Sequence, residues 1–118
     1  MKTIYTCYYT SPKLKNIKKE KLVSISRDCP YKVNIREINE FKPTERLLNL
    51  WKNKEINWDE YMEEYANQLE SYDMETIFND LNDGDILLCS EKDSDKCHRS
   101  LVREYINNLD LNVNIKEL

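Results

Sequence analysis

The feature that most restricts the fold is a short, wholly apolar run, Ile86–Cys89, with a turn before it and a polar loop after it. The turn contains Gly84, the only glycine of the chain, and the loop covers residues 91–96. A strand with one face in solvent alternates apolar and polar residues, whereas a strand covered on both faces is apolar throughout. The run therefore predicts a central strand of a mostly parallel sheet that has helices on both sides.

Strand and helix patterns alternate along the rest of the chain. Further strands are predicted at residues 3–9, 21–26 and 31–38 and around Val113 and Ile115. Helices are predicted from Pro43, from Asn57 with Glu60 as its capping-box partner, from Asp73 and from Cys97. Because 118 residues suffice for one core, we predict a single α/β domain over residues 1–118. Its expected fold is a small three-layer, Rossmann-like domain with a short sheet.

Composition and charge restrict the partners. The chain is 40% hydrophobic and 34% charged, as in globular proteins, and no apolar run approaches the ~20 residues of a membrane span. Without a signal-peptide core, a cytoplasmic protein with no membrane contact is expected. Residues 55–85 contain eleven acidic and no basic side chains, and lysines cluster at residues 13–21. Duplex nucleic acid would require a broader basic surface, so it is not an expected partner.

The four cysteines are Cys7, Cys29, Cys89 and Cys97, and none of them forms a CxxC pair. In a chain without an export signal they are expected to be free thiols. His98 is the only histidine, and a structural zinc site uses closely spaced ligand pairs. We therefore expect no metal, no cofactor and no disulfide.

Candidate ligand-binding residues follow from the rule that parallel α/β sheets bind ligands outside the carboxyl ends of their strands. The candidates near these ends are Tyr5, Tyr8, Tyr9, Ser26, Arg27, Lys92 and Arg99. Arg27 and Arg99 are predicted to clamp a phosphate together with the N-terminus of the helix near Cys97. The tyrosines could stack on a base, and Glu91 could accept hydrogen bonds from a ribose.

Three residues are candidates for catalysis: Glu91, Cys97 and His98. A helix N-terminus and Arg99 favour a thiolate at Cys97, but adjacent helical side chains do not face each other, so a Cys97–His98 pair is not expected. Glu91 or His98 is the expected acid–base group. A phosphatase loop starting at Cys89 is excluded, because Asp95 stands where such a loop needs arginine. In the alternative reading Cys97 is a small buried residue, His98 holds the preceding loop, and Arg99 pairs with Glu91 or Asp95.

The chain resembles the domain-of-unknown-function 488 family. The resemblance rests on residues 86–92, on Cys97-His98-Arg99-Ser100-Leu101-Val102, on Ile4-Tyr5-Thr6, on Ser24-Ile25-Ser26-Arg27 and on Tyr61, Tyr65 and Leu69. Ser90 departs from the aromatic residue expected there, and residues 93–96 lack the usual proline and aromatic residue. The resemblance implies an α/β fold with a site around Cys97-His98-Arg99, and it brings no settled activity.

Two functions remain open from the sequence. The first is a protein that binds, and in one version processes, a small phosphate-bearing ligand such as a nucleotide or a nucleotide-derived signal, in a bacterial or phage defence setting. The alternative is a protein-interaction module that uses the acidic face of residues 55–85, with Cys97-His98-Arg99 as a structural lock. Oligomeric state is open, with a homo-oligomer as one option.

Overall fold

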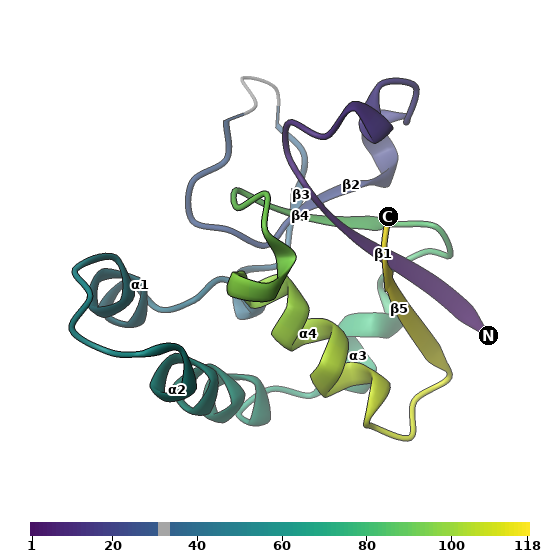
Figure 1. Cartoon of the computed structure of the whole chain (residues 1–118). Coiled ribbons are helices and arrows are strands. Elements are labelled where there is room, and N and C mark those ends of the chain that lie inside the picture. The colour runs from purple at the N-terminus through teal and green to yellow at the C-terminus, as the bar shows by residue number, and fades with distance from the viewer. Residues whose placement is uncertain (31–33) are drawn as a thin grey trace.

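The computed structural model describes residues 1–30 and 34–118, and its centre is a five-stranded sheet (Figure 1). The strands are β1 Lys2–Tyr8, β2 Leu22–Ser24, β3 Arg36–Glu37, β4 Ile86–Cys89 and β5 Val113–Glu117. Their order is β3-β2-β4-β1-β5, and every pairing in the described part of the chain is parallel. The predicted Rossmann-like α/β fold is confirmed.

The apolar run forms the centre of this sheet. β4 pairs with β1 on one side and with β2 on the other, so that Leu88 lies between Cys7 and Ser24. All four of its residues are buried, as expected for a strand covered on both faces. The strand predicted at residues 31–38 is shorter, since it is confined to β3, and residues 31–33 lie outside the described residues.

The helices are α1 Glu45–Lys52, α2 Trp58–Glu70, α3 Met74–Asn79 and α4 His98–Asn107. The capping box at the start of α2 is present: Asn57 and Glu60 each accept a hydrogen bond from the other's backbone N–H, at 2.8 and 3.0 Å. The helix expected from Pro43 begins two residues later, because Thr44 is its N-cap and accepts from Leu47. No helix among the described residues is long and apolar enough to cross a membrane.

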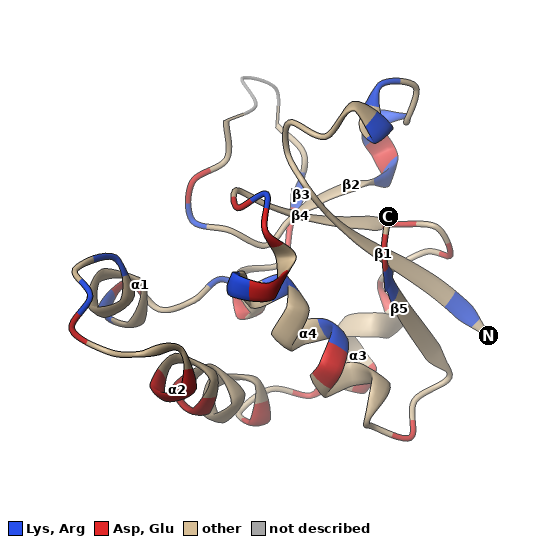
Figure 2. Cartoon of the chain, viewed as in Figure 1, with Lys and Arg blue, Asp and Glu red and all other residues tan. Residues whose placement is uncertain are grey.

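Charge is separated between two parts of the fold (Figure 2). Acidic residues lie along α2 and α3, and the basic cluster of residues 13–21 lies in the connection between β1 and β2. One exposed ion pair, Arg46–Glu64, joins α1 to the acidic helix α2 at 2.7 Å.

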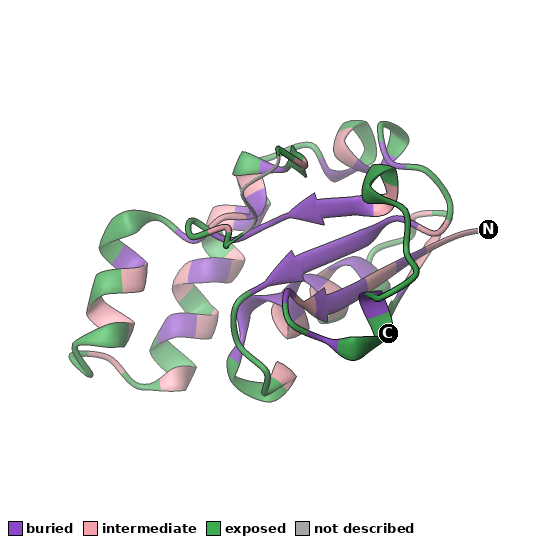
Figure 3. Cartoon of the chain, turned by 90° about the horizontal axis from the view of Figure 1, so that it is seen from above, coloured by how far each residue is buried: buried purple, intermediate pink, exposed green. Residues whose placement is uncertain are grey.

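The two faces of the sheet are covered differently (Figure 3). The α-helices cover one face and build the larger core with residues such as Tyr65, Phe78 and Val102. The opposite face is covered by the β1–β2 connection, whose short 3₁₀ helices are Pro12–Leu14 and Lys19–Lys21. Leu14 packs there in the second core. The third layer is therefore made of short turns rather than α-helices.

The connections that follow β1 and β4 leave the sheet on opposite faces. The chain after β1 crosses β4 on the face of Leu14, whereas the chain after β4 crosses β1 through α4 on the other face. Tyr8 and Cys89, the last residues of the two strands, are register partners. Open α/β sheets bind ligands at such a reversal, and in this chain a cleft lies beside it, at the ends of β2 and β4.

Candidate functional site

A cleft of about 90 Å³ lies at the carboxyl ends of β2 and β4, next to the start of α4. It is lined by four of the residues selected from the sequence: Ser26, Glu91, Cys97 and His98. Ser26 follows β2, Glu91 follows β4, and the other two begin α4, so three distant segments meet here. The cleft therefore brings together four of the ten predicted site residues, and its use as a functional site stays a prediction.

His98 is held rigidly at the inner end of the cleft. Its Nε2 lies 2.6 Å from the carbonyl oxygen of Ile25, and its ring meets Tyr65 edge-on with centroids 5.7 Å apart. Because a carbonyl only accepts, Nε2 carries the proton and Nδ1 keeps its lone pair. Desolvation lowers the pKa of His98 to about 4, although the bond to Ile25 opposes the shift. At pH 7 the ring is neutral, and Nδ1 can accept a hydrogen bond.

Cys97 contacts His98, contrary to the prediction from their adjacency. Its Sγ lies 3.7 Å from His98 Nδ1. Cys97 is the N-cap of α4 with φ −127° and ψ 144°, so its backbone is extended and the helical spacing rule does not apply. The two side chains are therefore in contact although they are adjacent in the sequence.

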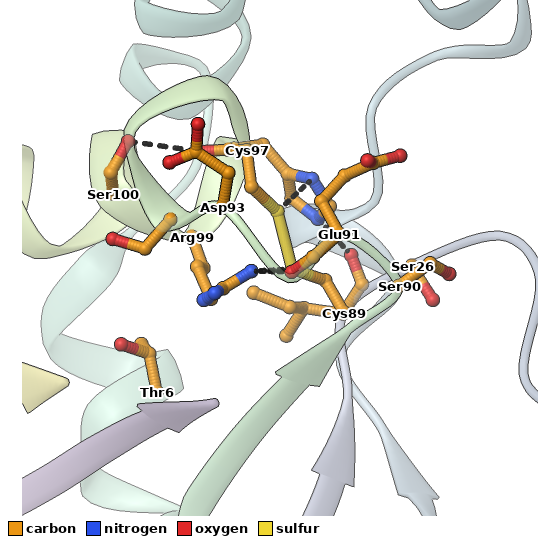
Figure 4. Close-up of a disulfide and its surroundings, with 12 residues drawn as sticks. Thr6, Ser26, Cys89, Ser90, Glu91, Asp93, Cys97, Arg99 and Ser100 are labelled. Atoms are coloured by element: carbon orange, nitrogen blue, oxygen red, sulfur yellow. Dashed lines mark hydrogen bonds between the residues drawn. A yellow bond between two sulfur atoms is a disulfide. The ribbon is translucent and has the colours of Figure 1, made fainter. Parts of the chain in front are cut away.

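The expectation of four free thiols is wrong for one pair. Cys89 and Cys97 form a disulfide, and Cys7 and Cys29 are free (Figure 4). The loop after β4 turns back through the 3₁₀ helix Ser94–Lys96, which brings the start of α4 to the end of the strand. Cys89, Cys97 and His98 also place their ligand atoms within 4.8 Å of one another, an arrangement that could hold a thiophilic metal only with the disulfide reduced.

Arg99 does not stand free to bind a phosphate. It is wholly buried, and each of its five N–H groups has an acceptor within the protein. Nη1 donates to Cys89 Sγ at 3.0 Å and to the carbonyl of Glu91, and Nη2 donates to the carbonyl of Lys92. Nε and Nη2 bind the carboxylate of Glu117 at 3.1–3.2 Å. Arg99 thus has the structural role of the alternative reading, with different partners from those expected.

Glu117 is the centre of this second polar region. Its Oε1 accepts from Thr6 Oγ1 at 2.6 Å and from Arg103 Nη1 at 3.0 Å, besides its bonds to Arg99. The Glu117 cluster, consisting of Thr6, Arg99, Arg103 and Glu117, joins β1, α4 and β5. It fastens α4 to the sheet on the side away from Ile25.

Arg27 and Arg99 do not converge on a common anion-binding site. Arg27 is exposed, and its Nε donates to the carbonyl of Pro43 at 2.6 Å, at the rim of the cleft. The predicted phosphate clamp therefore does not form, because Arg99 is used inside the protein. Lys92 is exposed in the loop after β4, and its carbonyl is one of the acceptors of Arg99.

The three predicted stacking tyrosines do not line the cleft. Tyr5 and Tyr8 pack against the second core, and the Tyr8 ring lies 5.9 Å from the Arg99 guanidinium carbon. Tyr9 is buried, with its hydroxyl 2.6 Å from both Ser24 Oγ and Ser26 Oγ. Tyr9 therefore positions Ser26 rather than presenting a ring to a ligand in the cleft.

The sequence interpretation missed the aromatic wall of the cleft. Trp51 and Tyr61 line it from α1 and α2, with ring centroids 5.7 Å apart. Trp58 stacks on Tyr61 at 5.0 Å and carries Lys96 above its ring at 5.4 Å. Burial, assisted by the charge of Glu91, raises the pKa of Tyr61. The one local signal for this wall in the sequence was a pair of tryptophans, Trp51 and Trp58, flanking a loop between two helices.

The parallel Rossmann-like sheet, with a polar and aromatic cleft at its carboxyl edge, places the chain in the α/β class of folds. Over residues 4–109 the chain matches the family model described as the active DUF488-N3 subclade. The chain belongs to the DUF488 family, as the resemblance implied. No curated protein and no solved structure matched it.

Proposed function

We propose that the protein binds and processes a small phosphate-bearing ligand, a nucleotide or a nucleotide-derived signal, in the cleft beside α4. The observation that carries the proposal is the convergence of Ser26, Glu91, Cys97 and His98 from three segments on one cleft. The volume of about 90 Å³ is below the ~300–1,000 Å³ of pockets that enclose drug-sized ligands. The cleft would then enclose one group of the ligand and leave the rest on its aromatic rim.

Two lysines replace the arginine clamp in this proposal. Lys52 and Lys96 line the cleft and are exposed, so their ammonium groups can move toward a phosphate. Lys52 is 3.7 Å from the exposed carboxylate of Asp28, an ion pair weak enough to be exchanged for a ligand. Trp51 offers a ring on which a base can stack.

The acid–base chemistry is assigned to Glu91, with His98 as a hydrogen-bond acceptor in the same cleft. Glu91 is exposed at the cleft and can exchange a proton with the ligand, as in cleavage or transfer at a glycosidic bond. His98 Nδ1 can accept a hydrogen bond from the Cys97 thiol when that cysteine is reduced, and so orients its sulfur in the cleft. The description of the matched subclade as active supports catalysis over binding alone.

The setting belongs to the proposal as well. Lysine, asparagine and isoleucine are abundant in the sequence, which is typical of an AT-rich bacterial or phage genome. We infer a cytoplasmic protein of a bacterium or phage, in which a nucleotide signal of a defence response would be a suitable ligand.

Native mass spectrometry of freshly purified protein, followed by calorimetric titration with ADP, NAD⁺ and inorganic phosphate, tests the proposal. We expect a nucleotide to bind more tightly than inorganic phosphate, and Lys96→Ala to weaken that binding by roughly tenfold, the loss of about one charged hydrogen bond. Glu91→Gln should still bind the ligand but no longer convert it. Mass analysis of the products measures this conversion.

Glu63→Gln is the matched control, since Glu63 is exposed on α2 and does not line the cleft. It should alter neither binding nor turnover. Protein that carries no small molecule and binds none of the three probes would contradict the proposal. Binding of a basic partner protein that is lost on substitution of the acidic α2 face, and kept by the cleft variants, would favour the interaction-module alternative.

A further inference from the structure

The two cysteines of the disulfide lie in different surroundings (Figure 4). Cys89 ends β4, is wholly buried, and accepts a hydrogen bond from Arg99 Nη1 at 3.0 Å. Cys97 caps α4 and lies 3.7 Å from His98 Nδ1. One sulfur is therefore next to a fixed cation, and the other is next to a neutral hydrogen-bond acceptor.

Access to the two sulfurs also differs. Cys97 lines the cleft together with His98, whereas Cys89 is not among the residues that line it. A reagent of the size of a small thiol that enters the cleft thus meets Cys97 first. The hydrogen bond from Arg99 stabilises a thiolate on Cys89, and a sulfur with a stabilised thiolate is the better leaving group.

We propose that Cys89 and Cys97 form a thiol–disulfide exchange centre that reacts with low-molecular-weight thiols through the cleft. This activity requires no nucleotide and does not depend on the function proposed above. The thiolate of the small thiol attacks Cys97 Sγ, the Cys89–Cys97 bond breaks, and its electron pair goes to Cys89 Sγ beside Arg99.

A second thiolate completes the cycle. It attacks the outer sulfur of the mixed disulfide on Cys97, which releases the oxidised small disulfide and leaves Cys97 as thiolate. The two protons from the small thiols end on the protein sulfurs, and His98 Nδ1 can accept a hydrogen bond from the Cys97 thiol so formed. The protein disulfide gains two electrons, and two small thiols are oxidised to one disulfide.

A metal centre is the rival use of the same residues. Cys89, Cys97 and His98 provide three ligand atoms and would leave a fourth position toward the cleft. Arg99, however, lies 3.0 Å from Cys89 Sγ and would add a positive charge next to a bound cation. Arg99 instead stabilises an anionic Cys89 sulfur, as the thiol–disulfide exchange centre requires.

The first measurement uses the unmodified chain. It is equilibrated anaerobically with glutathione and glutathione disulfide at graded ratios, quenched with acid and labelled with a maleimide after unfolding. Intact mass should show two labels on the oxidised protein and four on the reduced protein, and peptide mapping should assign the change to Cys89 and Cys97. Four labels even in excess glutathione disulfide, or one zinc per reduced chain, would overturn the proposal.

Single variants test the assigned order of attack. In glutathione disulfide, Cys89→Ser should form a mixed disulfide on Cys97 at least tenfold faster than Cys97→Ser forms one on Cys89. Cys29→Ser is the matched control, since Cys29 is a half-buried free thiol outside the pair, and it should keep the two-thiol step. Equal rates at Cys89 and Cys97 would contradict the proposed access through the cleft.

Discussion

His98 and Arg99 follow one another on α4 but belong to two regions with opposite properties. His98 faces the cleft, where Glu91, Lys52 and Lys96 are exposed and can meet a ligand. Arg99 belongs to the Glu117 cluster, and each of its N–H groups already has a partner inside the protein. A polar network that is fully satisfied holds the fold together, whereas polar groups that line an accessible cleft can bind and react.

The largest expected effect tests the structural region. Arg99→Met keeps much of the side-chain volume but removes all the hydrogen bonds of a fully buried guanidinium, to the Glu91 and Lys92 carbonyls and to Glu117, so we expect a loss of about 3–5 kcal/mol in unfolding free energy. Urea denaturation gives the value. Arg27→Met is the control: Arg27 is exposed and makes one bond to Pro43, so its loss should stay below about 1.5 kcal/mol. Equal losses would remove the distinction between the two arginines.

The next effect tests His98 at the boundary of the cleft. Its pKa of about 4 in the folded protein lies below the ordinary 6.5, so the unfolded chain binds more protons between these pH values. Stability should therefore be full above pH 6.5 and fall as the pH drops from 6.5 to 4, by up to about 3 kcal/mol.

Unfolding of the wild type and of His98→Gln across this pH range isolates the contribution of one residue. Glutamine can still donate to the Ile25 carbonyl but does not titrate, so the difference between the two proteins should shrink toward low pH. A constant difference from pH 4 to pH 7 would mean that His98 titrates as an exposed histidine does.

Features of the fold that depend on near neighbours could be predicted from the sequence. The run Ile86–Cys89 and the capping box of Asn57 and Glu60 are local patterns, and both were predicted correctly because strand burial and helix capping depend on near neighbours. The rule for parallel sheets predicts a site at the carboxyl ends of the strands, and a cleft lies at the ends of β2 and β4.

The partners of the α4 residues depend on contacts that no local pattern encodes. Arg99 binds Glu117, 18 residues away, and His98 binds the carbonyl of Ile25, 73 residues away. The contact between Cys97 and His98 was missed for a different reason. The helix was predicted to begin at Cys97, one residue before its start at His98. Secondary structure was therefore predictable, and the assignment of roles within Cys97-His98-Arg99 was not.

The disulfide joins the two regions, and its effect should be intermediate. Cys89 lies against Arg99 and Cys97 lies at the cleft, with a sequence separation of 8. Closing a loop of this length restricts the unfolded chain by about 2–3 kcal/mol, so reduction should lower the unfolding free energy by that amount. Urea denaturation with and without a phosphine reductant measures it. Cys97→Ser, which cannot form the bond, should show no response to the reductant.

The smallest effect on stability is expected at Glu91, and it is the most direct test of the comparison. The side chain of Glu91 is exposed at the cleft, and its structural contribution comes from the backbone carbonyl that accepts from Arg99. Glu91→Gln preserves that carbonyl and the side-chain shape, so the unfolding free energy should change by less than about 0.5 kcal/mol. If the cleft is the reactive region, the same substitution should remove turnover of the bound ligand. A loss of stability as large as that of Arg99→Met would instead make Glu91 part of the structural network, and the cleft would then lack its acid–base group.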